Sequence, residues 1–146
     1  MENITIRRER LCADEYIDFL KRTDLGSQYP KERFHERIEK LVQHAAISLV
    51  ARNRENSIVG VLFAITDFAY WMFITDLGID RDYVKQGIGR RLFEMAVEDA
   101  GGKENIIVYT NAYSKAIPFY EKMGMKRSED DIMEINEIPW THFVVE

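Results

Sequence analysis

The spacing of apolar residues changes along the chain, and each spacing predicts a type of secondary-structure element. Residues 47–52 and 58–66 are apolar, β-branched runs separated by the polar residues 53–57, which is typical of a hairpin. Residues 70–80 form a third such run, so we expect an antiparallel meander. Further strands are predicted around Ile4 and Ile6, over residues 105–111, and twice within residues 125–146, where residues 141–145 give the clearer pattern.

Helical spacing is found in the intervening segments. It predicts four helices, over residues 14–22, 31–44, 86–100 and 114–123. Pro30 is well placed to start the second of them, and Gly101 follows the third as a helix-ending glycine commonly does.

The resulting element order is β-α-α-β-β-β-α-β-α-β-β. Three antiparallel strands followed by a strand–helix–strand crossover predict a mixed, mostly antiparallel sheet of about six or seven strands. About four helices are expected on its two faces, which is an α/β layered fold. Nothing resembling a repeat or a linker interrupts the pattern, so a single domain over residues 1–146 is expected.

Composition narrows the functional classes. The 146 residues are 46% hydrophobic and 31% charged, as in a globular protein, and a net charge of −5 argues against a nucleic-acid partner. The longest apolar run is far shorter than a membrane span, so we expect no membrane association and a cytoplasmic protein. The one cysteine, Cys12, excludes an intramolecular disulfide and is expected to be a small packed residue.

The first candidate for chemistry is a pair of glycines, Gly87 and Gly89, where a predicted strand passes into a helix. Glycine lets the backbone approach a phosphate, and the unpaired N–H groups of the first helical turn attract anions. Lys85, Arg90 and Arg91 add positive charge. The alternative interpretation is only a tight turn. The Rossmann pattern fits poorly and the P-loop pattern fails, because no Gly-Lys-Ser/Thr follows.

A second group of candidate residues lies about twenty residues further on. Asn111 ends a predicted strand and could offer its amide to an extended ligand. Tyr120 follows on a short helix, where its hydroxyl could act as a general acid. Taken by itself, a tyrosine in this position is more often a packed aromatic residue.

Together these two segments resemble the GNAT family of N-acetyltransferases, over about residues 47–125. The pyrophosphate loop of that family, R/Q-x-x-G-x-G/A, is similar to residues 84–89, with Val84 in place of the usual arginine or glutamine. The second cofactor motif of the family is similar to the segment that contains Asn111, Ala116, Phe119, Tyr120 and Gly124.

The resemblance implies acetyl-CoA as cosubstrate and assigns residues to it. The backbone of the central strand would pair with the pantetheine arm, the glycine loop would hold the pyrophosphate, and Tyr120 would protonate the departing thiolate. The amine would attack the thioester directly, without a covalent intermediate. The implied cofactor-binding residues are Leu77, Ile79, Val84, Lys85, Gln86, Gly87, Ile88, Gly89, Arg90, Asn111, Phe119 and Tyr120.

The acceptor side is less defined by the sequence. Asp76 is the candidate general base, although it could equally be a structural acid, with a chain of waters removing the proton. Aromatic residues could line a pocket for the amine, with core packing as their alternative use: Tyr29, Phe34, Tyr70, Trp71 and Phe73. The three histidines are not spaced as a metal site, so no metal is expected.

Two functions from different classes therefore remain open. The first is an N-acetyltransferase that acts on a primary amine of a small molecule or peptide, as a monomer or homodimer. The second is a non-catalytic module that binds acyl-CoA as a sensor or partner subunit. A nucleotide-binding domain that uses the same glycine loop is disfavoured because the Walker lysine is absent.

Overall fold

The computed structural model describes residues 3–112, 115–128 and 142–145, and for residues 27, 127–128 and 142–145 it describes the backbone only. The predicted starts at residues 114 and 141 lie outside these ranges. The predicted element order is confirmed. The elements are β1 (Thr5–Arg8), α1 (Ala13–Leu20), η1 (Gly26–Gln28), α2 (Phe34–His44), β2 (Ile47–Arg52), β3 (Ile58–Thr66), β4 (Trp71–Ile79), η2 (Arg81–Tyr83), α3 (Ile88–Ala100), β5 (Ile107–Asn111), α4 (Ile117–Lys122), β6 (Met125–Ser128) and β7 (His142–Val145).

The strands form one seven-stranded sheet in the order β1-β2-β3-β4-β5-β7-β6. All neighbouring pairs are antiparallel except β4 and β5, which are parallel and are joined through α3. The expected meander of β2, β3 and β4 and the expected crossover are therefore both present. A mixed, mostly antiparallel sheet is confirmed.

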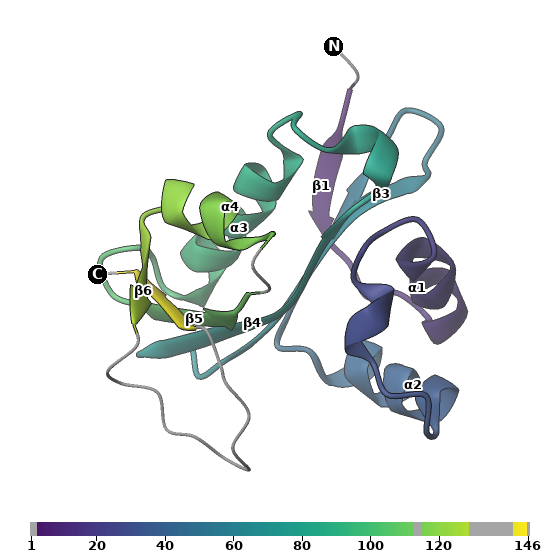
Figure 1. Ribbon diagram of the computed structural model, residues 1–146, viewed down its shortest axis with the longest axis horizontal. Coiled ribbons are helices and arrows are strands. Elements are labelled where there is room, and N and C mark those ends of the chain that lie inside the picture. Colours follow the sequence, from purple (N-terminus) through teal and green to yellow (C-terminus); the bar gives the residue numbers. More distant parts are fainter. Residues whose placement is uncertain (1–2, 113–114, 129–141, 146) are drawn as a thin grey trace.

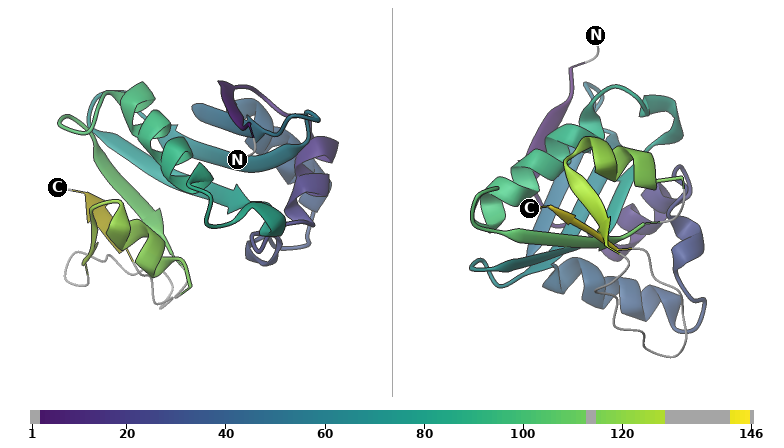
Figure 2. Two further views of the ribbon diagram at one scale, coloured as in Figure 1. Left: turned by 90° about the horizontal axis from the view of Figure 1, so that it is seen from above. Right: turned by 60° about the vertical axis from the view of Figure 1, so that its left-hand side comes forward.

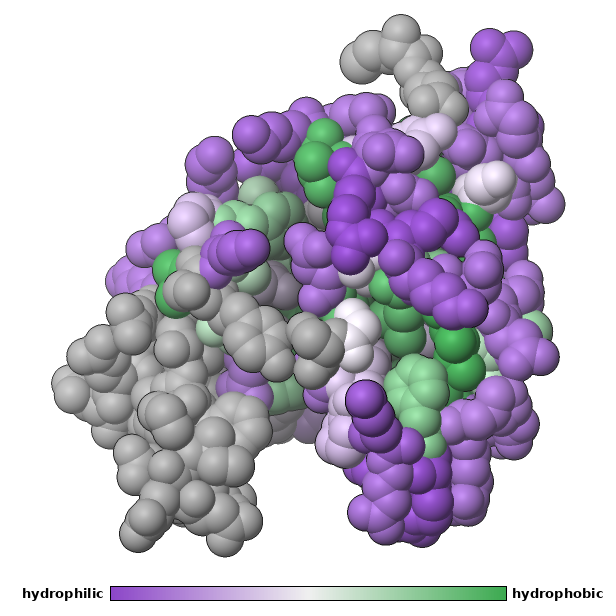
Figure 3. Space-filling model, turned by 45° about the vertical axis from the view of Figure 1, so that its right-hand side comes forward, coloured by the Kyte–Doolittle hydropathy of each residue, from purple (hydrophilic) through white to green (hydrophobic). Residues whose placement is uncertain are grey.

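Helices cover both faces of the sheet, as Figures 1 and 2 show. On one face α3 and α4 pack over a core that includes Leu62, Met72 and Leu92. On the other face α1 and α2 enclose a second core around Tyr16 and Phe63. Each helix buries one apolar stripe and leaves its polar side outward, so the surface over α1 and α2 is largely hydrophilic in Figure 3.

Two local expectations are wrong. The second helix begins at Phe34 rather than just after Pro30, because the backbone of Arg33 has φ 50°, in the left-handed region that a right-handed helix excludes. Cys12 is exposed rather than packed. It is the N-cap residue of α1, where its backbone N–H donates to the side chain of Glu15 at 3.2 Å.

Candidate active site

The pairing between the two parallel strands at the centre of the sheet, β4 and β5, stops partway along β4. Their last register pair joins Ile74 of β4 to Thr110 of β5, and β5 ends one residue later at Asn111. At this point the hydroxyl of Thr110 donates to the carbonyl oxygen of Ile74 at 3.0 Å. This side-chain hydrogen bond therefore lies at the end of the paired region, where the backbone pairing between β4 and β5 stops.

Beyond that point β4 continues to Ile79 with a strand partner on one side. Leu77 and Ile79 are paired with β3, whereas in the described part of the chain no β5 residue is in register with them. Every second backbone N–H and C=O on this edge of β4 is consequently directed away from β3. An extended ligand can add to such an edge as a further strand, which is the role that the family resemblance implies for these two residues.

A β-bulge decides which way the side chains of β4 point. Phe63 of β3 is in register with Asp76 and the next residue, Ala64, with Ile74, so Thr75 is the extra residue on β4. Ile74 packs in the core beneath α3, and so does Leu77, although strict alternation would put them on opposite faces. The bulge thereby turns Asp76 toward α1.

Asp76 is a buried carboxylate, only 2% exposed. Its Oδ2 accepts a hydrogen bond from the hydroxyl of Tyr16 at 2.7 Å and another from Nε2 of Gln28 at 3.3 Å. Burial raises the pKa of Asp76 from 3.8 to about 6, while the hydrogen bond from Tyr16 lowers it. A carboxyl group with this pKa is ionised at neutral pH and is suited to accept a proton.

Tyr120 approaches the same point from α4. Its ring is buried and meets the ring of Phe119 edge to face, with centroids 5.1 Å apart. Burial raises the pKa of Tyr120 to about 12; the Asp76 charge also raises it, and a hydrogen bond with Thr110 lowers it. The hydroxyl therefore lies beside the end of the β4–β5 ladder and keeps its proton at neutral pH.

The glycine loop opens α3 as the sequence predicts. Gly87 is the N-cap residue with φ 81°, and Lys85 two residues earlier has φ 64°. The N–H groups of Ile88, Gly89 and Arg90 precede the first intrahelical bond, which runs from Arg91 to Gly87 at 3.1 Å. Unpaired donors at the positive end of a 13-residue helix make an anion site.

Gly89 brings this helix end into direct contact with α4. A Cβ atom built on Gly89 would lie 2.9 Å from Cε1 of Phe119, closer than real contacts allow. The missing side chain therefore lets α3 pack against the ring that Tyr120 in turn contacts. In this way the helix that begins at the glycine pair contacts the helix that carries Tyr120.

The charged residues around the loop have different surroundings. Arg91 donates to the carbonyl oxygen of Ile4 at 3.1 Å and so anchors the N-terminal segment. Arg90 reaches Glu94 on its own helix at 3.5 Å, and Lys85 and Gln86 are exposed. Val84, at the position where the family usually has a polar residue, is 50% exposed.

The predicted acceptor residues fall into two groups. Tyr29 and Phe34 have ring centroids 6.0 Å apart, and the Tyr29 hydroxyl lies 3.3 Å from that of Tyr16, which connects this pair to Asp76. Trp71 and Tyr70 lie at the opposite end of β4, where Tyr70 is 66% exposed.

The remaining predicted residues lie along the paired part of β4 and β5. Phe73 is half-buried and in register with Tyr109, whose ring stacks on that of Trp71 at 5.5 Å. Asn111 is exposed at the end of β5. The structure thus brings Tyr29 into the hydrogen-bond network of Asp76, through Tyr16, and leaves Tyr70 outside it.

Sequence reasoning missed Tyr16 and Thr110. Both are ordinary polar residues in their local context, and their partners Asp76 and Ile74 lie 60 and 36 positions away. No local pattern could have identified them.

Ion pairs fix the loop that precedes Gly87, and these too were missed. Asp80, the residue after β4, pairs with Arg22 at 3.0 Å, and Arg81 pairs with Asp24 at 3.0 Å. Arg81 also donates to the carbonyl oxygen of Thr23 at 2.6 Å. The connection after α1 and the loop before α3 are consequently held together.

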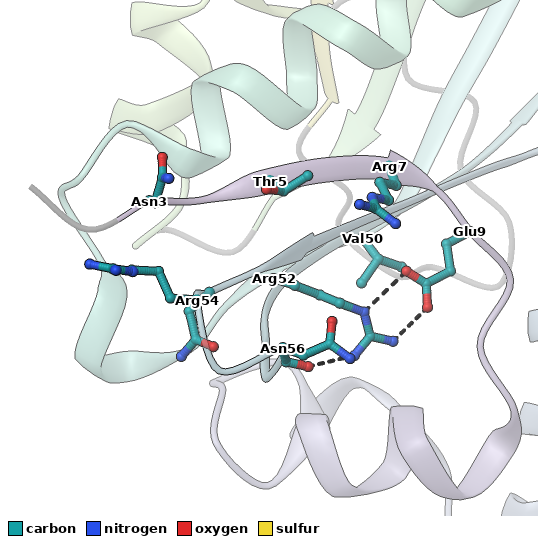
Figure 4. Close-up of a pocket in the computed structure, with 9 residues that line it drawn as sticks. Asn3, Thr5, Arg7, Glu9, Val50, Arg52, Arg54 and Asn56 are labelled. Atoms are coloured by element: carbon teal, nitrogen blue, oxygen red, sulfur yellow. Dashed lines mark hydrogen bonds and ion pairs between the residues drawn. The ribbon is translucent and has the colours of Figure 1, made fainter.

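A separate cavity of about 340 Å³ lies beside β1 and β2 (Figure 4). Thr5 and Arg7 of β1 and Arg52 of β2 line it, with the buried Val50 at its base, and Arg52 is held by Glu9 at 3.1 Å. In the sheet, β3 and β4 separate this cavity from β5. It is therefore distinct from the site at the β4–β5 divergence.

Among the residues that the structure describes, no group of three His, Cys, Asp or Glu side chains is arranged to hold a metal ion. None of the helices in this part of the chain is long and apolar enough to cross a bilayer.

Comparison with known proteins agrees with this fold. The model of the acetyltransferase (GNAT) family matches residues 12–125. The chain therefore belongs to the GNAT acetyltransferase family, as its motifs predict. No curated protein sequence matches the chain at a significant level.

Solved structures share the fold at low sequence identity. A GNAT-family acetyltransferase from Staphylococcus aureus Mu50 superposes with a TM-score of 0.75 at 16% identity, covering 98% of both chains. The PaiA N-acetyltransferase of Thermoplasma acidophilum, solved with coenzyme A, gives 0.69 at 15% identity and 99% coverage of both. The Escherichia coli GNAT N-acetyltransferase YhbS, also with CoA, gives 0.70 at 17% identity, over 99% of this chain and 80% of that one.

Proposed function

We propose that this protein is an acetyl-CoA-dependent N-acetyltransferase, folded as one domain, that acetylates a primary amine of a small molecule or peptide. The observation that carries the proposal is the separation of β4 and β5 after Ile74 and Thr110, with Tyr120 and Asp76 both at the point of separation. The edge of β4 without a β5 partner, the N-terminal end of α3 at Gly87 and the Tyr120 hydroxyl together support the proposal.

Acetyl-CoA would bind along this edge of β4 through the chain's backbone. Leu77 and Ile79 would pair with the amide groups of the pantetheine arm, and the N–H groups of residues 85–90 would hold the pyrophosphate. Because these contacts come from the backbone, Val84 is compatible with binding. The CoA-bound relatives from Thermoplasma acidophilum and Escherichia coli support this choice of cosubstrate.

The two ionisable groups suit the two proton transfers of the reaction. Asp76 points toward α1, whereas Tyr120 comes from α4 on the other face. An amine approaching from the α1 side would lose a proton to Asp76, directly or through water, and its nitrogen would attack the thioester carbon. The C–S bond then breaks, and Tyr120 gives its proton to the departing thiolate.

Ligand-dependent thermal unfolding tests the cosubstrate. Saturating ligand at about a hundred times its dissociation constant stabilises a protein by roughly 2.7 kcal/mol. We expect acetyl-CoA and CoA to raise the melting temperature and ATP to leave it unchanged. A shift with ATP alone, or with none of the three, would contradict the proposal.

A panel of amines with detection of released CoA thiol tests the reaction. Turnover with at least one primary amine, abolished when the amine is methylated to a quaternary ammonium, is the expected result. CoA binding without turnover of any amine would instead favour the non-catalytic acyl-CoA-binding module.

A further inference from the structure

The two oxygens of the Asp76 carboxylate have different surroundings. Both of its hydrogen bonds, from Tyr16 at 2.7 Å and from Gln28 at 3.3 Å, go to Oδ2. Within the described residues, Oδ1 has no hydrogen-bond donor and the carboxylate has no ion-pair partner. A buried carboxylate oxygen without a partner is uncommon in proteins, and it is the atom available to an incoming group.

Tyr16 is fixed more firmly than the other donor. It is fully buried in α1, and its ring packs against those of Phe63, with centroids 4.8 Å apart, and Phe19 at 6.3 Å. A tyrosine hydroxyl has one proton, which here goes to Asp76. The Tyr29 hydroxyl, 3.3 Å away, must therefore donate to the oxygen of Tyr16.

We propose that Tyr16 is a positioning residue for the acetyl transfer: it occupies Oδ2 of Asp76 and keeps Oδ1 directed at the amine whose proton it takes. This inference rests on the proposed function. Tyr16 touches neither reactant in this arrangement and acts through Asp76 alone. Tyr29 supports it from the half-buried acceptor side by orienting the Tyr16 hydroxyl.

Because Asp76 has no ion-pair partner among the described residues, the hydrogen bond from Tyr16 is left to hold its carboxylate. Among the described residues, the titratable groups that face Asp76 are tyrosines: Tyr16 from α1, Tyr120 from α4 and, one hydrogen bond further, Tyr29. Burial favours the protonated carboxyl, and the hydrogen bond from Tyr16 opposes it. Within the described part of the chain, the carboxylate is thus stabilised by neutral hydrogen-bond donors rather than by a cation.

The test is the variant Tyr16→Phe, which keeps the packed ring and removes only the hydroxyl. The titration of Asp76 would be followed by NMR of its side-chain carbonyl carbon, assigned with Asp76→Asn. Loss of a donor to the charged form should raise the Asp76 pKa by about one pH unit. The acidic limb of kcat/KM should move by the same amount, with the KM for acetyl-CoA unchanged.

Tyr29→Phe is the matched control, because it removes a hydroxyl from the same chain of hydrogen bonds without touching Asp76. We expect it to shift the titration much less than Tyr16→Phe does. An Asp76 titration that stays in place in Tyr16→Phe overturns the inference, whether or not the enzyme turns over. If the wild type acetylates no amine while Tyr16→Phe still shifts the Asp76 titration, the proposed function is refuted and the hydrogen-bond assignment stands.

Discussion

The hydroxyl of Thr110 donates to the carbonyl oxygen of Ile74 at 3.0 Å, at the last register pair between β4 and β5. Thr110 is 2% exposed, and it is also the hydrogen-bond partner of Tyr120. One buried side chain therefore joins the end of the strand ladder to the proposed proton donor.

Replacing Thr110 with valine keeps the shape of the side chain and removes both of these bonds. We expect the free energy of unfolding to fall by about 1 kcal/mol, the usual net worth of a buried neutral hydrogen bond, and kcat to fall as well. Thr110→Ser retains the hydroxyl and should keep most of the activity. Urea unfolding and steady-state kinetics on both variants measure this, and equal loss of kcat in the two would count against the role of the hydroxyl.

Tyr120→Phe should separate chemistry from cofactor binding. Without the hydroxyl, the thiolate leaves unprotonated, and general acid catalysis of this kind contributes about 10²–10⁴-fold to the rate. We expect kcat to fall by that order, with the Kd for CoA unchanged in calorimetry. Tyr109→Phe is the control, because the Tyr109 ring stacks on Trp71 away from Tyr120. A Tyr120→Phe enzyme with full kcat would exclude Tyr120 as the acid.

Asp76→Asn should make the fold more stable at neutral pH while it removes the base. The pKa of Asp76 is raised on folding from 3.8 to about 6, so the native state holds the proton more tightly than the unfolded chain. The stability of the wild type therefore falls as pH rises from about 4 to about 6, and it stays lower above that range.

In Asp76→Asn the side chain does not titrate, so the stability of the variant lacks this pH dependence. We expect Asp76→Asn to unfold at higher urea than the wild type at pH 7.5, by up to about 3 kcal/mol, with the gap narrowing at pH 4. Urea titrations at the two pH values measure the gap. A variant less stable than the wild type at pH 7.5 would show that Asp76 is not under a burial penalty.

Gly89→Ala tests the contact between α3 and α4. The added methyl group would lie 2.9 Å from the ring of Phe119, so we expect a loss of about 1–3 kcal/mol from overpacking and weaker binding of CoA. A second change, Phe119→Leu, removes the ring atoms in conflict and should recover part of the stability.

Gly87→Ala is the comparison, because a methyl group there meets open space but the backbone has φ 81°. It should lose about 1 kcal/mol through backbone strain, and Phe119→Leu should not restore it. Rescue of both alanine variants by Phe119→Leu would contradict the steric explanation. Thermal unfolding with and without CoA provides the readout.

Much of the fold was predictable because it follows from local pattern. The strands over residues 47–52 and 58–66 have the predicted bounds, and the glycine pair lies at a strand-to-helix junction as expected. Amphipathic periodicity depends only on which face of an element is buried, so it can be read along the chain. The start of α2 was misplaced because the left-handed backbone of Arg33 has no such pattern.

The sequence by itself thus determined the order of the elements, the layered fold and the family motifs around Gly87 and Tyr120. Only the tertiary structure decided the bulge at Thr75, which turns Asp76 toward α1, and the partners Tyr16 and Gln28 that hold it. Strand register and buried hydrogen bonds join residues far apart in the chain. Their energies depend on packing between elements, which no local periodicity records.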